Sequence, residues 1–118
     1  MLKVLVVLYK RPDLTWGEFR RYWRDEHGRL AQDIPGIRRY IHNDALEESK
    51  PPYGVAELWF DSHEALEAGL NSPEGQAALN DLGRFCDEAQ TGIIVVPDAG
   101  VIEVIHEPAA SSDADAVH

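Results

Sequence analysis

The spacing of hydrophobic residues along the chain predicts several short strands separated by two helical regions. Residues 2–9 are a run of Leu, Val and Tyr interrupted only by Lys3, which is typical of a strand with apolar side chains on both faces. Because such a strand needs cover on both sides, we expect it near the centre of a sheet. Shorter β-branched or aromatic runs predict four further strands, at residues 37–42, 55–60, 93–96 and 101–105.

The first helix is predicted to begin at Thr15. Thr15 and Glu18 have the Thr-x-x-Glu spacing of a capping box, in which each side chain accepts a hydrogen bond from the other residue's backbone N–H. One stripe of residues then follows at spacings of three and four: Trp16, Phe19, Trp23, His27 and Leu30. This stripe predicts that His27 lies on the buried side of the helix.

The second helical region is predicted to be broken near Asn71. Ser62 can cap a helix through residues 65–70, and Ser72 followed by Pro73 has the pattern of a second helix start. Between the two helical regions, the strand at 37–42 is expected to place Tyr40 and His42 on the same face.

The first six of these elements, in the order β-α-β-β-α-β, predict an α+β fold of the ferredoxin-like type with two helical regions on one face of an antiparallel sheet. The other face would be a large apolar patch on a monomer, so we expect a second copy of the chain to cover it in a homodimer. The fifth strand is expected to add to the partner or cross onto it. We expect residues 1–106 to form one domain and residues 107–118 to be a disordered acidic tail.

Charge and cysteine content exclude several classes of partner. The net charge is −10, and residues 51–118 carry 13 acidic but only 1 basic side chain. Such a chain repels polyanions, so we expect no nucleic-acid partner and no binding to anionic membranes. No segment approaches the roughly 20 apolar residues of a membrane span.

The single Cys86 cannot form an internal disulfide, and this predicts a reducing, cytoplasmic setting.

Five segments resemble the EthD family, in matching order within residues 2–105. They are Tyr-Lys-Arg-Pro (9–12), Phe-Arg-Arg-Tyr-Trp-Arg-Asp-Glu-His (19–27), Pro-Gly-Ile-Arg-Arg-Tyr (35–40), Gly-Val-Ala-Glu-Leu-Trp-Phe-Asp-Ser (54–62) and Ser-Pro-Glu-Gly-Gln-Ala-Ala-Leu (72–79). The resemblance implies a dimeric α+β barrel with a small pocket between the first helix and the sheet. Proteins similar to this chain include a methylmuconolactone isomerase, decarboxylases and cyclases of polyketides, and proteins of unassigned role in ether degradation.

This resemblance leads to three hypotheses about function. The first is a cofactor-independent lyase, isomerase or cyclase that acts on a small aromatic, polyketide-derived or lactone substrate by histidine-based acid–base chemistry. The second is a small-molecule-binding accessory protein without catalytic activity. The third is a cofactor-free monooxygenase. The chain shows no pattern of a metal site, phosphate loop or dinucleotide fingerprint, so we expect no metal and no cofactor.

His27 is the main catalytic candidate, because it ends the family-like motif and also lies on the apolar stripe; a hydrogen-bonded core histidine is the alternative. Tyr40 and His42 could together orient and polarise a carbonyl oxygen, or could be packing and rim residues. Glu57, between apolar neighbours, could fix a histidine tautomer, act as a second base or form an ion pair with Arg38 or Arg39.

The substrate-binding candidates are Trp23 and Trp59, whose rings could line a pocket for an aromatic ligand. Trp at core spacing is more often simply part of the core, and this applies to Trp23 more than to Trp59. Cys86 has no basic neighbours in the sequence, so we expect it to pack as a small hydrophobic residue rather than act as a nucleophile.

Overall fold

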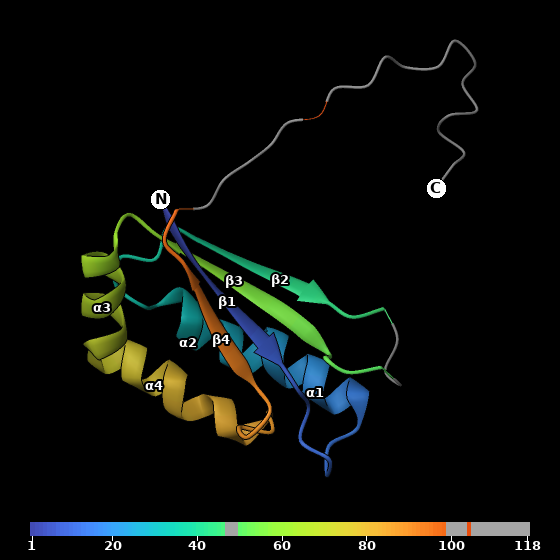
Figure 1. The fold of residues 1–118 in the computed structure, drawn as a ribbon. Coiled ribbons are helices and arrows are strands. Elements are labelled where there is room, and N and C mark those ends of the chain that lie inside the picture. Colours follow the sequence, from blue (N-terminus) through green and yellow to red (C-terminus); the bar gives the residue numbers. More distant parts are fainter. Residues whose placement is uncertain (47–49, 99–103, 105–118) are drawn as a thin grey trace.

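The structure, a computed structural model, describes residues 1–46, 50–98 and 104 (Figure 1). Its elements are β1 (Leu2–Leu8), α1 (Trp16–Tyr22), a π-helical turn (Trp23–His27), α2 (Gly28–Gln32), β2 (Arg39–Asp44), β3 (Gly54–Phe60), α3 (His63–Asn71), α4 (Pro73–Asp81), a 3-10 turn (Leu82–Arg84) and β4 (Gly92–Val96). The predicted order β-α-β-β-α-β is therefore confirmed. The expected fifth strand, apart from its residue 104, and the expected tail lie outside the described residues.

The four strands form one antiparallel sheet in the order β2-β3-β1-β4. β1 is central, as its two apolar faces predicted. Leu5 pairs with Glu57 on one side and with Ile94 on the other, and this register fixes which residues share a face. The helices all cover the same face of the sheet, and no element among the described residues covers the opposite face, which we call the open face (Figure 1).

The hydrophobic core lies between the helices and the covered face of the sheet. In β1 and β3 every second residue is buried and the residues between them are only partly buried, as expected for strands with one face in the core. The largest fully buried side chains are Trp23, Phe19, Phe60, Phe85, Leu8 and Cys86. In the described part of the chain, no helix has the length and apolar character needed to cross a membrane.

The first helical region begins as predicted but is not a uniform α-helix. The Thr15 hydroxyl accepts a hydrogen bond from the Glu18 backbone at 3.1 Å, and the Glu18 carboxylate accepts one from the Thr15 backbone at 2.9 Å. After Tyr22 the helix widens into the π-helical turn, and the N–H of Gly28 donates to the carbonyl of Trp23. Spacings of three and four residues fit both kinds of turn, so the sequence pattern could not reveal it. π-turns occur frequently at functional sites.

The predicted break in the second helical region is confirmed at Ser72, between α3 and α4. The Ser72 hydroxyl accepts a hydrogen bond from the Gly75 backbone at 3.0 Å and donates one to the Gly69 carbonyl at 2.6 Å. One side chain thus caps the start of α4 and satisfies a carbonyl at the end of α3.

The second strand begins two residues later than expected, at Arg39 rather than Ile37. Gly36 adopts a positive φ of 84°, and the N–H of Ile37 donates to the carbonyl of Ile34 within this turn, so Ile37 does not join the ladder. The faces of the strand are unaffected. Tyr40 pairs with Leu58 and His42 with Ala56, so both project toward the helices, as their predicted common face requires.

Gly54 is the point where β3 passes closest to the first helical region. A Cβ atom here would lie 2.5 and 2.7 Å from ring carbons of Trp23. We therefore expect Gly54→Ala to lower the free energy of unfolding by about 1–3 kcal/mol, because the indole ring must move within a packed core. Urea denaturation measures this change. The matched control is Gly17→Ala in α1, where no described atom outside the neighbouring residues and the helix's own backbone lies within 4 Å of the added carbon, and its stability should be unchanged or slightly higher.

Candidate active site

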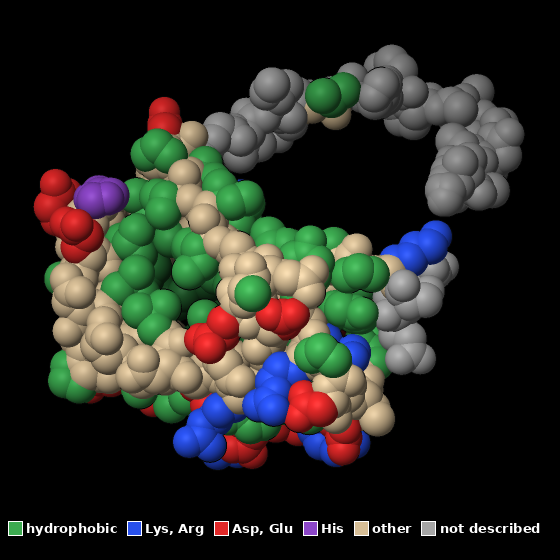
Figure 2. All heavy atoms as spheres, turned by 60° about the horizontal axis from the view of Figure 1, so that its bottom comes forward, with side chains coloured by type: hydrophobic (Ala, Val, Ile, Leu, Met, Phe, Trp, Pro, Cys, Tyr) green, Lys and Arg blue, Asp and Glu red, His purple; other side chains and the backbone are tan. Residues whose placement is uncertain are grey.

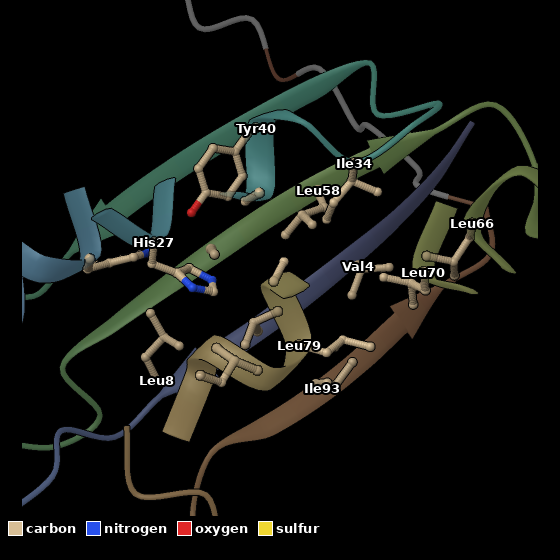
Figure 3. Close-up of a pocket in the computed structure, with 16 residues that line it drawn as sticks. Val4, Leu8, His27, Ile34, Tyr40, Leu58, Leu66, Leu70, Leu79 and Ile93 are labelled. Atoms are coloured by element: carbon tan, nitrogen blue, oxygen red, sulfur yellow. The ribbon is translucent and has the colours of Figure 1, made fainter. Parts of the chain in front are cut away.

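An apolar pocket lies between the covered face of the sheet and the helices. Figure 2 shows it as a hollow lined with hydrophobic side chains, and Figure 3 shows the residues around it. It is lined by Val4, Val6, Leu8, Trp23, His27, Ala31, Ile34, Tyr40, Ala56, Leu58, Leu66, Leu70, Ala78, Leu79, Leu82 and Ile93. Ile93 on the edge strand β4 is 53% exposed, so the pocket reaches the surface beside this strand. His27 and Tyr40 bring ionisable groups to this otherwise hydrophobic lining.

His27 is buried and forms a hydrogen bond with a second buried ionisable residue, Asp81. Its Nδ1 lies 3.0 Å from Oδ2 of Asp81, and the two side chains are 9% and 7% exposed. Because a carboxylate only accepts hydrogen bonds, Nδ1 carries the proton and Nε2 of the neutral ring is left as the acceptor. Nε2 bonds no described residue and is not among the fully buried polar atoms without a partner, so it is open to the pocket.

The surroundings of His27 favour its neutral, basic form. Burial lowers the pKa of His27 below the ordinary value of 6.5, and the hydrogen bond and charge of Asp81 act in the opposite direction. The ring also packs against Phe85, with centroids 4.9 Å apart. A neutral imidazole with a carboxylate on Nδ1 is a base held in one tautomer, and the carboxylate stabilises the imidazolium that forms when Nε2 takes a proton.

Asp81 is held from its other side by Tyr22 and Arg84. The Tyr22 hydroxyl donates to Oδ1 of Asp81 at 2.7 Å, and Nε of Arg84 lies 3.5 Å from the same atom. Burial, followed by the interaction with Asp81, raises the pKa of Tyr22 to about 12 and keeps the phenol a donor. Sequence reasoning missed Asp81. The available signal was its spacing of three residues from Ala78, which places an acid on the buried stripe of α4.

Tyr40 and His42 form a second hydrogen-bonded pair beside the same pocket. Nε2 of His42 lies 2.7 Å from the Tyr40 hydroxyl, and the His42 ring stacks on Trp23 with centroids 4.3 Å apart. The Tyr40 hydroxyl points toward the end of the pocket where the His27 ring lies (Figure 3). Burial raises the pKa of Tyr40 to about 12, so it remains a phenol. The indole N–H of Trp23, which also lines the pocket, is buried and bonds no described residue.

Glu57 and Trp59 are not brought to this pocket. They project from the open face, because β3 turns Leu58 and Ala56 toward the helices and the alternate residues away from them. Glu57 lies 3.7 Å from Nζ of Lys3 and accepts a hydrogen bond from Asn43 at 3.0 Å, so its ion pair is with Lys3 rather than with an arginine. The acid beside His27 is Asp81, not Glu57.

The described residues offer neither a reactive thiol nor a cluster of metal ligands. Cys86 is 2% exposed, and burial raises the pKa of its thiol to about 12, so it packs as a neutral side chain. Among residues 1–46, 50–98 and 104, no group of three or more His, Cys, Asp or Glu side chains is placed to hold a metal ion.

Acid is expected to destabilise the protein through His27. The unfolded chain binds a proton at this residue as the pH falls through about 6.5, whereas the folded ring stays neutral down to its lowered pKa. Between these two pH values His27 should reduce the free energy of unfolding by up to about 1.4 kcal/mol per pH unit. Urea denaturation of the protein and of His27→Gln over a pH series measures this contribution. Parallel curves for the two proteins would contradict it.

Comparison with known proteins assigns the chain to a family. A model of the EthD domain matches residues 11–89. The chain belongs to the EthD family. A protein from Rhodococcus erythropolis, an uncharacterized 11.0 kDa protein in the thcB-thcC intergenic region, is 32% identical over 90 residues, which cover 74% of this chain and 86% of the relative. The family resemblance drawn from the sequence motifs is therefore confirmed.

Solved structures confirm the fold of this EthD protein. An ethyl tert-butyl ether D (EthD) family protein from Bacillus halodurans has a TM-score of 0.70 at 22% identity, over 84% of this chain and 100% of that one. A dimeric ferredoxin-like protein of unknown function from Thermobifida fusca has a TM-score of 0.64 at 15% identity, over 81% and 89%. SnoaB, a cofactor-independent oxygenase from Streptomyces nogalater, has a TM-score of 0.62 at 13% identity, over 86% and 95%. At these identities the likeness establishes the ferredoxin-like fold.

Proposed function

We propose that this EthD protein is a cofactor-independent enzyme, a lyase, isomerase or cyclase, that moves a proton at a carbon atom next to a carbonyl group of a small substrate. The observation that carries the proposal is His27, a buried neutral histidine with Asp81 on Nδ1 and with Nε2 open to an apolar pocket. An isolated core histidine would not need a buried carboxylate as its partner, because burying a charge is costly.

The residues around the pocket have complementary roles in such a reaction. Nε2 of His27 takes the proton from carbon, and the charge of Asp81 stabilises the imidazolium. Negative charge then develops on the carbonyl oxygen, where the Tyr40 hydroxyl is the available donor. An apolar lining strengthens these interactions because little water competes for them.

The size of the pocket limits the substrate. Its cavity volume is about 60 Å³, less than half of the roughly 150 Å³ of an engineered cavity that holds benzene. A ring-sized substrate therefore places its reacting end beside His27 and extends out of the pocket beside Ile93. The apolar lining favours an aromatic, lactone or other weakly polar compound over a sugar or a nucleotide.

Deuterium incorporation tests the proposal whatever the final product of the reaction is. The protein is incubated in D₂O without oxygen with a panel of small aryl ketones, β-keto esters and unsaturated lactones, and the C–H signals are followed by NMR. We expect enzyme-dependent exchange at the carbon next to the carbonyl for some members of the panel. Binding of panel members, seen by native mass spectrometry, with no exchange in any of them would favour the accessory binding protein instead.

A cofactor-free monooxygenase is the second candidate, and the fold shared with SnoaB is the observation that favours it. The same base would produce a carbanion from an anthrone or hydroxynaphthalene, and O₂ would then be the electron acceptor. An oxygen electrode separates the two functions. Oxygen uptake that needs both protein and substrate would support the monooxygenase, and exchange without oxygen uptake would support the lyase or isomerase.

We infer that two copies of the chain pair through the open face of the sheet. Leu5, Val7, Val55 and Trp59 lie on this face, and Ile94 is 50% exposed there. Such a patch is unusual on a monomer, and an isologous pair would remove it from water. The dimeric ferredoxin-like protein of Thermobifida fusca shows that this fold supports pairing. The pocket lies on the other face, so each protomer would keep its own His27.

A further inference from the structure

His42 lies next to the pocket but is not one of its lining residues. It lies behind Tyr40, with Nε2 2.7 Å from the phenol oxygen and the two rings edge to face at 4.7 Å. Trp23 stacks on its face with ring centroids 4.3 Å apart, and Gly28 lies beside the ring, where a Cβ atom would be in ordinary contact with it at 3.6 Å. Both rings of the pair are therefore held in place, and their hydrogen bond is a fixed feature of the site.

The far side of His42 reaches solvent. Its Nδ1 bonds no described residue, and it is not among the fully buried polar atoms that lack a partner. His42 is half-buried overall. A continuous path of two hydrogen-bonding side chains therefore leads from the pocket, through the Tyr40 hydroxyl and the imidazole, to water.

The imidazole can satisfy Tyr40 in two ways. Burial lowers the pKa of His42, Asp44 opposes this effect, and His27 and Arg24 add to it, so the ring is neutral at pH 7 and one nitrogen carries the proton. With the proton on Nδ1, Nε2 accepts the hydrogen of Tyr40. With the proton on Nε2, the ring donates to the phenol oxygen and the hydrogen of Tyr40 is available to a ligand in the pocket.

We propose that Tyr40 and His42 form a proton relay between the pocket and solvent, in which His42 changes tautomer as an oxygen atom of the bound substrate gains or loses its proton. The relay rests on the proposed acid–base function and adds a second path to it. Tyr40 is the catalytic residue that contacts the substrate oxygen. His42 is a positioning residue that acts through Tyr40.

The proton transfers of the relay balance in both directions. When an enolate oxygen takes the Tyr40 proton, the phenol oxygen takes the Nε2 proton of His42, and Nδ1 takes a proton from water. The net result is one proton moved from solvent to the substrate, and the ring ends with its hydrogen on Nδ1. The reverse sequence removes a proton from a substrate hydroxyl and restores the first tautomer. An isomerisation uses both directions, so the relay is reset after each turnover.

The test uses 4-nitrophenol as a probe, because its anion presents an enolate-like oxygen on a small apolar ring. Protein with ¹⁵N-labelled histidine is studied by NMR near pH 8, where the two ring nitrogens report the tautomer of each histidine. In the unliganded protein we expect the His42 proton on Nδ1, since the buried Tyr40 hydroxyl needs an acceptor. With the phenolate bound we expect it on Nε2. The matched control is Tyr40→Phe, which should bind the probe without any tautomer change at His42.

The outcomes of this experiment test the relay independently of the proposed reaction. A bound probe with His42 unchanged, or an equal change in Tyr40→Phe, would overturn the relay while leaving the role of His27 intact. A failure of 4-nitrophenol to bind would overturn it as well, since no oxyanion would then reach Tyr40. Absence of deuterium exchange over the whole substrate panel, with a tautomer change at His42 still observed, would count against the proposed reaction alone.

Discussion

Replacing His27 with Gln is expected to lower the turnover number for proton exchange by about 10²–10⁴-fold, the usual contribution of a general base. Gln is close in size and can still bond Asp81, so the pocket should persist, but its amide cannot take a proton at neutral pH. The measurement is the initial rate of deuterium incorporation with a substrate found in the panel. Circular dichroism and the unfolding midpoint show whether the variant remains folded.

His63→Gln is the matched control for this substitution. His63 lies in the first turn of α3 with its side chain 60% exposed, and its interaction at 3.7 Å is with Glu67 on the same helix. The same chemical change there should leave the exchange rate unaltered. If a folded His27→Gln variant exchanged as fast as the His63→Gln control, His27 would have no part in the chemistry and its bond to Asp81 would be structural.

The second large effect is expected from Ile94→Asp, which should weaken the proposed dimer by about 10³-fold or more. Two symmetric copies of the carboxylate would be buried in an isologous interface, and each costs several kcal/mol if it has no partner. Ile94 is 50% exposed in the single chain, so the protomer itself should still fold. Light scattering with size-exclusion chromatography over a range of concentrations measures the change.

Ile93→Asp controls for the position on the same strand. Ile93 is the adjacent residue, it is 53% exposed, and its side chain lines the pocket on the opposite face of β4. The dimer should survive this change, whereas binding of 4-nitrophenol should weaken because an acid now stands at the pocket opening. Equal loss of dimer in both variants would place the interface elsewhere than on the open face.

Local features of the chain were predictable because they depend on neighbours in sequence. The capping box at Thr15 and the break at Ser72 are formed by side chains that bond backbone groups within three residues, and residue type and spacing are enough to identify them. The central place of β1 followed from apolar residues on both of its faces. The burial of His27 followed from the helical stripe in the same way.

The partners of the candidate site residues depend on long-range register, which the sequence does not contain. Asp81 meets His27 across 54 positions in sequence, and only the packing of α4 against the first helical region brings them together. Glu57 illustrates a second limit of sequence patterns, which concerns the two faces of the sheet. Alternation along a strand places Glu57 on the same face as Trp59 and Tyr40 on the same face as His42, but it cannot show that these two pairs project to opposite faces of the sheet. The pairing of Tyr40 with Leu58 in the sheet shows that Tyr40 and His42 face the helices, whereas Glu57 and Trp59 face away from them.

The alternation along β1 has a consequence for how this protein can be changed. Val4, Val6 and Leu8 contribute to the pocket, whereas Lys3 and Leu5 belong to the open face. Substitutions at even positions of this strand should therefore alter ligand preference, and substitutions at odd positions should alter assembly. A mutant library confined to the even positions could change ligand preference while assembly is held constant, and a library confined to the odd positions could do the reverse. The two sets of residues alternate along a single strand.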